Sequence, residues 1–515
     1  MNITNKQIFN LTSKHFSKVD FTKDTESETD SDSNIDYNSS DESLSSSTNS
    51  NNSDSDSESN TESNSDSNSE SNSETDSKTD TETESEIDDL KIDSNDLFNT
   101  KTNGNEFYSE VLNNRYLILK KLGYGSFSSV WMAYDVNDNI LVAVKIINPE
   151  DYKEGMIELQ TYLRLQKLDC TYLLTMLDYF QVAPIHYKYF EESYKEEHKK
   201  ERNHIVMILP LMACSTFDLL KCNEYEDGLP LDVCTKIIHQ TLLGVKELEK
   251  HNLMHTDLKP ENILVCGLNR EAELLLKIIN DINIKQLHKN QLEQKKDVSD
   301  LWFESYKLFK DITKTIITFM NKEMKDIKQQ MKSCKVSSKY INDIKIKICD
   351  FNLVINADEK LDNKNIQIQT RYYRAPEIIL GCGLHKKTDY WSIGCIFFEL
   401  LTGDILFDPE KDKLRSRDIF HMYLIEELMG NIPKNMIANA SNSDKLYDEN
   451  SFLLNVGKKI KRSDLKNVFE ENHDNVGLSE DKLNKVIKFM ESTLQINPDL
   501  RPNMKTMIEN ITKLD

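Results

Sequence analysis

Hydrophobic and polar positions follow two different periods along most of the chain. In residues 113–211 the apolar residues alternate or form short runs, such as Val142–Lys145 and Ile205–Leu209, and this pattern predicts strands. From residue 212 they recur every three or four positions, as in Leu231–His251, and this pattern predicts helices. We therefore expect an α+β protein with a β-rich part at 113–211, here called the first lobe, and an α-helical part at 212–515, here called the second lobe.

The N-terminal region lacks either pattern. Residues 20–100 consist largely of Ser, Asp, Glu, Asn and Thr, and residues 21–100 contain 24 Asp/Glu and three Lys, a net charge of −21. Such a segment buries too little apolar surface to offset chain entropy, so we expect a disordered acidic tail that follows a separate segment at 1–19. Three interpretations remain open: a solubilising tail, a set of phosphorylation sites, or a mimic of an acidic ligand that folds back on a basic surface.

The charge of the remaining chain excludes one class of function. The whole chain carries −23 and residues 1–20 carry +2, so residues 101–515 carry only −4. A nucleic-acid-binding core would need a basic face. Nine scattered cysteines without a Cys-x-x-Cys pair indicate a reducing compartment, and nothing resembles a signal peptide or a membrane span. We expect a soluble, monomeric, cytoplasmic protein; Lys458–Arg462 is either a nuclear address or a solvated basic face.

Residues 268–342, below called the insertion, form a long charged segment within the second lobe. It contains 15 Lys/Arg and 10 Asp/Glu, and its apolar residues recur at helical spacing: Trp302, Tyr306, Phe309, Ile312, Ile316, Met320, Met324, Ile327 and Met331. This spacing predicts an amphipathic helix of about eight turns that needs a surface to cover. Packing on its own lobe is the favoured interpretation, with docking of a partner or anchoring in the cell as alternatives.

The polar stretch His255–Asn262 combines an acid, a base and an amide, and the apolar run Ile263–Val265 after it predicts a short buried strand. A carboxylate at Asp257 can orient a hydroxyl group and accept its proton. Lys259 can reach a transferring phosphoryl group, and Asn262 can hold a metal ion beside it. The stretch therefore predicts a catalytic loop.

The first lobe contains candidate nucleotide-binding residues. Gly123 and Gly125 allow backbone amides to approach phosphate oxygens, although an ordinary turn explains them equally well. Lys145 ends a half-buried strand, where a charge needs an anionic partner unless the side chain reaches the surface. Glu158, in a helical pattern 13 residues further on, is the candidate partner, and Glu154 is the second choice.

These motifs, in this order, resemble those of protein kinases. The loop at 255–262 resembles the kinase pattern that ends in Asp-x-x-x-x-Asn. Asp350-Phe351-Asn352, after an alternating strand, resembles the metal-binding Asp-Phe-Gly, and Ala375-Pro376-Glu377 resembles the end of an activation segment. The resemblance covers residues 115–510. It implies the two-lobed protein-kinase fold and transfer of the γ-phosphoryl group of ATP to Ser or Thr hydroxyls of protein substrates, with Mg²⁺ as the metal.

The resemblance also assigns roles to individual residues. Those assigned to catalysis are Asp257, Lys259 and Thr370, and those assigned to Mg²⁺ are Asn262 and Asp350. Those assigned to ATP are Gly123, Gly125, Ser126, Val130, Ala143, Lys145, Glu158, Leu209, Leu211 and Met212. In structural roles, Glu377 is expected to pair with Arg501, and Asp389 is expected to bind the backbone of the catalytic loop.

Three positions depart from the common kinase pattern. Thr256 replaces an arginine that commonly needs a phosphate on the activation segment, so we expect activity without phosphorylation between Asn352 and Thr370. Ser128 and Asn352 replace glycines and support an alternative function, a catalytically impaired pseudokinase that acts as a scaffold. The four side chains that the chemistry requires are all present, and this argues against the alternative. They are Lys145, Asp257, Asn262 and Asp350.

The second lobe resembles the SR-protein kinases in particular. The similarity lies in His-Thr-Asp-Leu-Lys-Pro-Glu-Asn at 255–262, in the long spacer after it and in Phe398–Phe407. It implies substrates rich in Arg and Ser that are held on acidic residues, for which Asp404 and Glu427 are candidates. Asn352 and Ala375 depart from that subgroup.

Overall fold

The computed structural model describes residues 107–125, 127–183, 203–222, 224–282, 307, 309–318, 341–359, 368–410, 415–456, 460–472 and 477–514. They belong to one of the two compact units into which the chain divides, and the other unit is Asp20–Thr100. The predictions for residues 1–19 and 20–100, for Ser126 and for Lys458–Lys459 lie outside the described residues. In the described part, no helix is both long enough and apolar enough to cross a bilayer.

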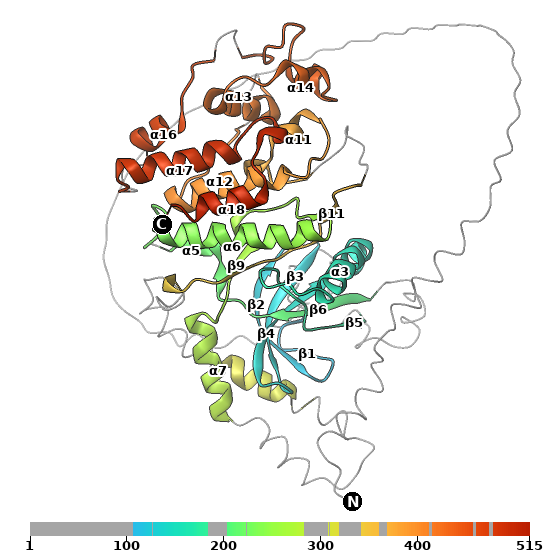
Figure 1. Cartoon of the computed structure of the whole chain (residues 1–515). Helices are drawn as coiled ribbons and strands as arrows, with labels where there is room; N and C mark the ends of the chain where they lie inside the picture. The colour runs from blue at the N-terminus through green and yellow to red at the C-terminus, as the bar shows by residue number, and fades with distance from the viewer. Residues whose placement is uncertain are drawn as a thin grey trace, which may run out of the picture. The chain divides into compact units, whose positions relative to one another are not determined.

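The first lobe is a six-stranded sheet in the order β1-β2-β3-β4-β6-β5. Its strands are β1 Val111–Leu112, β2 Tyr116–Tyr124, β3 Ser128–Asp135, β4 Ile140–Ile147, β5 Asp178–Val182 and β6 His204–Pro210. All neighbouring strands are antiparallel. Figure 1 shows α3 (Tyr152–Gln166) beside this sheet, where it packs against β6. The chain's β-branched and aromatic residues suit this pleated surface, and the predicted β-rich lobe is confirmed.

The second lobe is mainly helical, as predicted. Its helices are α5 Thr216–Leu220, α6 Leu231–Lys250, α11 Pro376–Leu380, α12 Thr388–Thr402, α13 Arg417–Met429, α14 Lys434–Ala438, α15 Ser443–Leu446, α16 Leu465–Asn472, α17 Glu480–Thr493 and α18 Met504–Ile511. Short strands accompany them: β7 Cys214–Ser215, β8 Leu253–Met254, β9 Ile263–Val265, β10 Ile346–Ile348 and β11 Ile355–Asn356. They form a three-stranded sheet, β10-β9-β7, and a pair, β11-β8.

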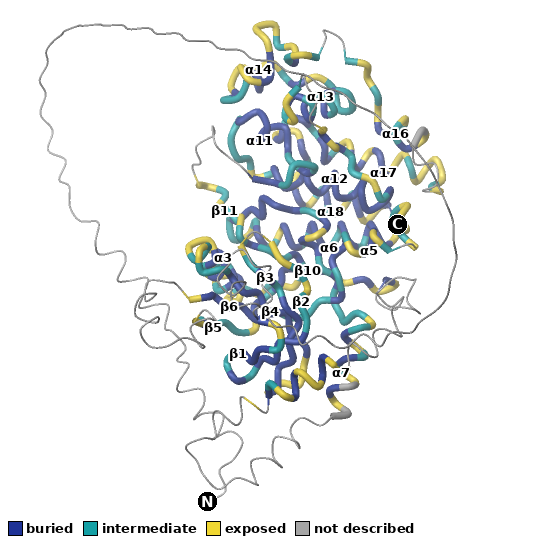
Figure 2. The backbone as a smooth tube through the Cα atoms, turned by 180° about the vertical axis from the view of Figure 1, so that it is seen from behind, coloured by how far each residue is buried: buried dark blue, intermediate teal, exposed yellow. Residues whose placement is uncertain are grey.

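Helix α12 forms the centre of the second lobe. Every one of its residues is buried, and Figure 2 shows it in dark blue. Helices α6 and α17 both pack against it. A helix surrounded in this way must be apolar nearly all round, and most of α12 is. The carboxylates of Asp389 and Glu399 on α12 are therefore buried and need hydrogen-bond partners.

The described part of the insertion packs on the sheet of the first lobe. It forms α7 (Arg270–Ile282) and a helical stretch at 307–318, whose buried apolar residues share one cluster with β2, β3 and β4. The residues from the insertion are Ala272, Leu275, Ile279, Phe309, Ile312 and Ile316. The predicted packing of the insertion on its own lobe is therefore wrong for these residues, because the surface that they cover belongs to the first lobe.

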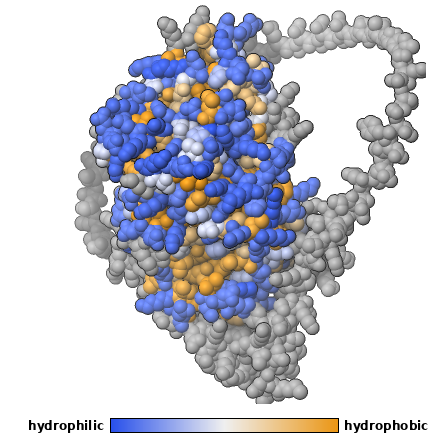
Figure 3. All heavy atoms as spheres, in the orientation of Figure 1, coloured by the Kyte–Doolittle hydropathy of each residue, from blue (hydrophilic) through white to orange (hydrophobic). Residues whose placement is uncertain are grey.

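Two ion pairs attach the insertion to the same surface. Lys120 of β2 lies 2.5 Å from Glu271, and Lys310 lies 2.7 Å from Glu110. Figure 1 shows α7 beside the sheet, and Figure 3 shows hydrophobic residues gathered on this part of the visible face. The remainder of the predicted eight-turn helix lies outside the described residues.

Truncation of one insertion residue is expected to destabilise the sheet. Ile316 is 0% exposed, and replacing it with alanine should lower the free energy of unfolding by about 2–5 kcal/mol, because a buried cavity remains. Urea denaturation of the full chain, followed by tryptophan fluorescence, measures the loss. The neighbouring exposed residue supplies the control: Thr315→Ala should change stability by less than about 0.5 kcal/mol. Equal stability of the two variants would contradict the packing.

Candidate active site

The predicted catalytic loop runs between β8 and β9, and α12 fixes its backbone. The carboxylate of Asp389 accepts hydrogen bonds from the backbone N–H groups of His255 (2.8 Å) and Thr256 (2.9 Å). Asp389 is only 2% exposed, and burial raises its pKa against the opposing influence of His255. The predicted contact between Asp389 and the loop is present, and it orients the loop from inside the lobe.

Three side chains meet at Asp257. Lys259 Nζ lies 2.6 Å from Asp257 Oδ2 and 3.1 Å from Thr370 Oγ1. The Thr370 hydroxyl donates to Asp257 Oδ1 at 2.7 Å, and its backbone N–H donates to the same oxygen at 3.0 Å. Asn262 Nδ2 donates to the Asp257 carbonyl oxygen at 2.9 Å. The structure therefore brings these four predicted residues together, with Asp257 6% exposed.

Lys145 lies between two carboxylates that come from distant parts of the chain. Its Nζ lies 2.6 Å from Glu158 Oε1 on α3 and 3.0 Å from Asp350 Oδ1 after β10. Burial lowers the pKa of the Lys145 ammonium, but the attraction of the two carboxylates outweighs this effect and raises it. Lys145 in turn lowers the pKa of Asp350 against the effect of burial. Glu154, the second choice for this pairing, is exposed on α3.

Asp350 and Asn262 are held side by side by backbone pairing. Strands β9 and β10 are antiparallel partners, and the N–H of Cys349 donates to the Asn262 carbonyl at 3.0 Å. One carboxylate and one amide suit a magnesium ion, which usually takes few protein ligands and several phosphate or water oxygens. No group of three or more His, Cys, Asp and Glu side chains that could form a metal cage occurs in the described residues.

Asn352 stands where the kinase pattern has a glycine, but it does not take a positive φ. Asn352 is absent from the left-handed residues, and the positive φ falls on Asp350 at 66°. Phe351 is 0% exposed and makes edge contacts with Tyr162 and His255. The turn after β10 thus forms without glycine, although Asn352 Oδ1 is buried and has no hydrogen-bond partner among the described residues.

The predicted ATP-binding residues of the sheet lie on neighbouring strands. Val130 is the cross-strand partner of Lys145, and Ala143 is the partner of Leu209, which is 6% exposed. Leu211, after β6, packs against the cluster that includes the insertion. Met212 is half-buried beside it. Ser126 lies outside the described residues, so this set is described without it.

The two glycines of the β2–β3 hairpin have no conformational reason to be glycine. Neither Gly123 nor Gly125 has a positive φ, and an added Cβ at either position would meet nothing within 4 Å. The open space beside both glycines leaves room for a ligand at the backbone, and it fits an ordinary exposed turn equally well. The N–H of Gly125 donates to the Ser128 carbonyl at 2.8 Å, which closes the turn.

A buried ion pair supports the segment after Thr370. Arg501 Nη1 and Nη2 lie 2.6 and 2.7 Å from the two carboxylate oxygens of Glu377, and the side chains are 0% and 2% exposed. The predicted pairing is therefore present and bidentate. Removing one partner of such a pair typically costs about 3–5 kcal/mol.

Two contacts were missed in the sequence. Tyr373 donates its hydroxyl hydrogen to Glu399 at 2.7 Å, and burial, opposed by this hydrogen bond, raises the pKa of Glu399 to about 7. The isolated carboxylate inside the apolar stretch of α12 was a signal for such a partner. The Thr256 hydroxyl donates to the Leu353 carbonyl. Nothing in the spacing of Thr256 and Leu353 predicts this second contact.

Comparison with known proteins identifies the family. Residues 116–305 and 325–511 match the family described as the protein kinase domain. The serine/threonine-protein kinase SRPK of Physarum polycephalum is 27% identical over 448 residues, which cover 81% of this chain and 92% of the relative. Protein kinase dsk1 of Schizosaccharomyces pombe is 26% identical over 467 residues and covers 78% of this chain and 80% of the relative.

A solved structure agrees in fold. The crystal structure of another kinase domain has a TM-score of 0.50 with this chain at 20% sequence identity. The match covers 78% of this chain and 96% of that domain. At this identity the match bears on the fold alone.

The pKa of Glu399 predicts a pH-dependent stability. The carboxyl is protonated in the folded state below about pH 7 and in the unfolded state only below about pH 4.5, so folding binds a proton between these values. The stabilisation is complete below the unfolded pKa and is lost as pH rises through the folded pKa. Between pH 5 and 8, Glu399→Gln should gain about 1–3 kcal/mol of unfolding free energy relative to wild type.

Urea denaturation at a series of pH values measures this difference. The exposed residue Glu449 gives a matched control, because Glu449→Gln removes a carboxyl that lies outside the core. Its difference from wild type should stay constant across the range. A constant difference for Glu399→Gln as well would contradict the protonation of Glu399.

Proposed function

Because this chain belongs to the protein kinase family, we propose that it transfers the γ-phosphoryl group of ATP in line to its substrate. The residues proposed to carry out this step are Lys145, Asp257, Lys259, Asn262 and Asp350. The chain is an ATP-dependent serine/threonine protein kinase that resembles the SR-protein kinases. Its family uses ATP with a divalent metal ion, and we propose Mg²⁺ as that ion. Membership of the protein kinase family also implies protein substrates that accept the phosphoryl group on Ser or Thr.

One observation in particular supports the assignment of Asp257 as the group that orients the substrate hydroxyl and accepts its proton. Its Oδ1 already accepts a hydrogen bond of 2.7 Å from a hydroxyl group, that of Thr370. A substrate hydroxyl in reach of this carboxylate would be oriented in the same way, and its proton would have an acceptor. Lys259, 2.6 Å from the same carboxylate, places a positive charge where the transferred group develops negative charge.

The remaining residues position the nucleotide. Lys145 is held by Glu158 and Asp350, so its ammonium group is oriented before the phosphates arrive. Asp350 and Asn262 would hold Mg²⁺, which when bound neutralises charge on the phosphate oxygens. Ala143, Val130 and Leu209 would enclose the adenine ring. The backbone amides near Gly123 and Gly125 would contact the phosphates. Leu211 and Met212, after β6, would contact the edge of the adenine ring.

The pseudokinase alternative has no specific support. Despite the replacement at Asn352, Asp350 Oδ1 lies 3.0 Å from Lys145 Nζ, so both proposed site residues are held together. For oligomeric state and location we propose a monomer in the cytoplasm, with the nucleus as the alternative, that binds no nucleic acid directly.

Changing the catalytic carboxylate should separate turnover from binding. Asp257→Asn should lower kcat about 10²–10⁴-fold, because the acceptor of the hydroxyl proton is lost. The affinity for ATP should remain within about twofold, because Lys145 and Asp350 are untouched. Phosphate-transfer assays on the full chain and calorimetric nucleotide titration measure the two quantities. Asp358→Asn, at an exposed position, is the control, and unchanged turnover in Asp257→Asn would refute the assignment.

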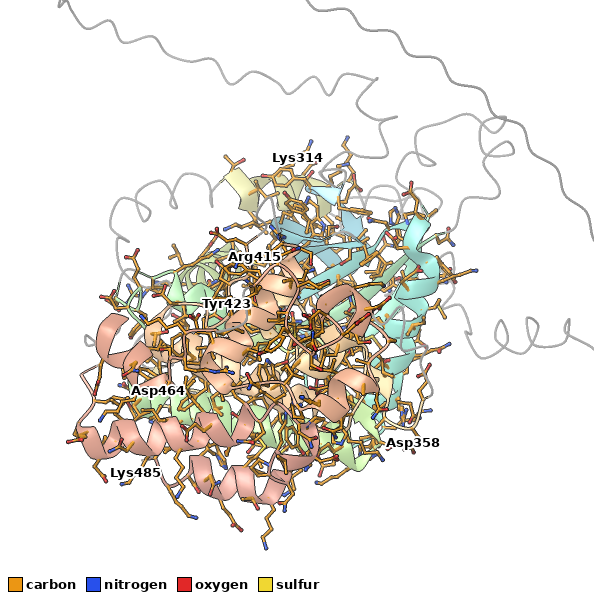
Figure 4. The ribbon with its side chains drawn as sticks, turned by 90° about the horizontal axis from the view of Figure 1, so that it is seen from above. Lys314, Asp358, Arg415, Tyr423, Asp464 and Lys485 are labelled. Carbon is orange, nitrogen blue, oxygen red and sulfur yellow. The ribbon has the colours of Figure 1, made fainter. Side chains whose placement is uncertain are left out.

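The substrate preference is the second part of the proposal. The family resemblance implies substrates rich in Arg and Ser, and Asp404 and Glu427 are the candidate acidic contacts. Asp404 is exposed after α12, and Glu427 on α13 accepts a 2.9 Å hydrogen bond from Tyr423. The Arg415 guanidinium lies 5.8 Å from the centre of the Tyr423 ring, and Figure 4 shows these two side chains near each other. A guanidinium group therefore fits against this ring beside a carboxylate.

A peptide library tests this preference. The full chain should phosphorylate serine peptides that contain arginine better than matched peptides with alanine. Glu427→Gln should weaken this discrimination about two- to fivefold, the worth of one exposed ion pair, and Glu449→Gln should not. Equal rates for both peptide sets would remove the substrate proposal and leave the kinase activity standing.

A further inference from the structure

Thr256 has a strained backbone at the centre of the site. Its φ is 61°, in the left-handed region that a β-branched residue rarely adopts, and it is 0% exposed. Such a conformation persists only where the surrounding contacts determine it. The residue lies directly before Asp257, so its contacts also control the placement of the catalytic carboxylate.

The three hydrogen-bonding groups of Thr256 reach three different segments. Its backbone N–H donates to Asp389 on α12 at 2.9 Å. Its carbonyl accepts from the N–H of Gln369, at the end of the activation segment, at 2.8 Å. Its hydroxyl donates to the carbonyl of Leu353, in the segment after Asp350. The first two bonds come from the backbone and survive a change of side chain, so only the bond to Leu353 depends on residue type.

The bond to Leu353 completes an attachment that begins in β11. Strand β11 pairs with β8 through Ile355 and Met254, and the Thr256 hydroxyl binds the chain two residues before Ile355. Leu353 follows Asp350 by three residues, and Asp350 itself has a left-handed φ of 66°. The hydroxyl thus extends the attachment of this segment toward the aspartate whose backbone is strained.

We propose that Thr256 is a positioning residue whose hydroxyl, through the Leu353 carbonyl, keeps Asp350 in place to bind the metal–nucleotide complex. The inference rests on the proposed function. Thr256 is not among the residues proposed to bind the metal or the nucleotide; its hydroxyl joins the loop that carries Asp257 to the segment that carries Asp350. Removing the hydroxyl takes this donor away from the Leu353 carbonyl, so the segment after Asp350 loses its side-chain attachment to the loop and can then move away.

Two variants separate the hydroxyl from the shape of the side chain. Thr256→Val keeps the branched shape and the burial but has no donor, whereas Thr256→Ser keeps the donor and loses only a methyl group. We expect Thr256→Val to lower the gain in ADP affinity that Mg²⁺ provides by about tenfold, in line with changes to groups that orient metal ligands. ADP affinity without Mg²⁺ should change much less, because Glu158 still holds Lys145 when Asp350 moves. Thr256→Ser should restore the gain.

The experiment is calorimetric titration of the full chain with ADP, with and without Mg²⁺, beside hydrogen exchange of the amides at 353–356. Faster exchange in Thr256→Val only, together with the loss of the magnesium gain, supports the proposal. An unchanged gain in Thr256→Val, or a loss in Thr256→Ser equal to that in Thr256→Val, overturns it. Where Thr256→Val does not fold, Thr256→Ala takes its place and must show the same pattern.

The outcome is separate from that of the proposed function. Binding of ADP and Mg²⁺ requires no phosphoryl transfer, so the titration remains readable even when no peptide is phosphorylated. A wild-type chain that binds the magnesium nucleotide but transfers no phosphoryl group would refute the proposed function only. A merely structural role of Thr256 would lower ADP affinity equally with and without the metal, and that result also overturns the proposal.

Discussion

The compensation of one buried ammonium group is the constraint on which the site depends. Lys145 comes from the sheet, Glu158 from α3 and Asp350 from the end of β10, so three elements must meet for the charge to be balanced. A buried charge that loses its partner is strongly destabilising, whereas the intact arrangement need add little net stability. The pairing therefore specifies where α3 and the segment after β10 lie. The contact between Lys145 and Asp350 also fixes these two side chains, which are proposed to face the nucleotide.

A second set of buried carboxylates performs a comparable task inside the second lobe. Asp389 and Glu399 both lie on the buried helix α12, one binding the backbone of the catalytic loop and the other the hydroxyl of Tyr373. Glu377 is paired with Arg501 close to them. The polar loops of the site thus attach to an apolar helix through a few carboxylates, which is the arrangement that places them accurately without covering them.

The sequence predicts contacts within motifs better than contacts between surfaces. The position of Lys145 in an apolar strand predicted an anionic partner, with Glu158 as the candidate, because a buried charge requires a counter-charge. The contact of Thr370 with Asp257 was expected from the resemblance to protein kinases. Asn352 replaces the glycine of the kinase pattern, yet the positive φ of this turn falls on Asp350, since φ depends on the whole turn and not on one residue's preference. The bond from Thr256 to Leu353 could not be foreseen, because hydroxyl groups find partners that only the folded backbone defines.

The insertion is a second case in which the sequence predicts an element but not the surface that the element contacts. Its spacing predicted an apolar face but could not say which surface that face covers. Side chains alternate between the faces of a strand, so Leu141, Ala143 and Lys145 share one face of β4. Leu141 belongs to the cluster that α7 and the stretch at 307–318 complete, and Leu211 packs against it. The insertion therefore covers the face of the sheet that carries the proposed ATP site, two residues along the strand from Ala143. A segment inserted in the second lobe thus borders the proposed adenine site of the first, and any movement of the sheet must carry the insertion with it or break their shared core.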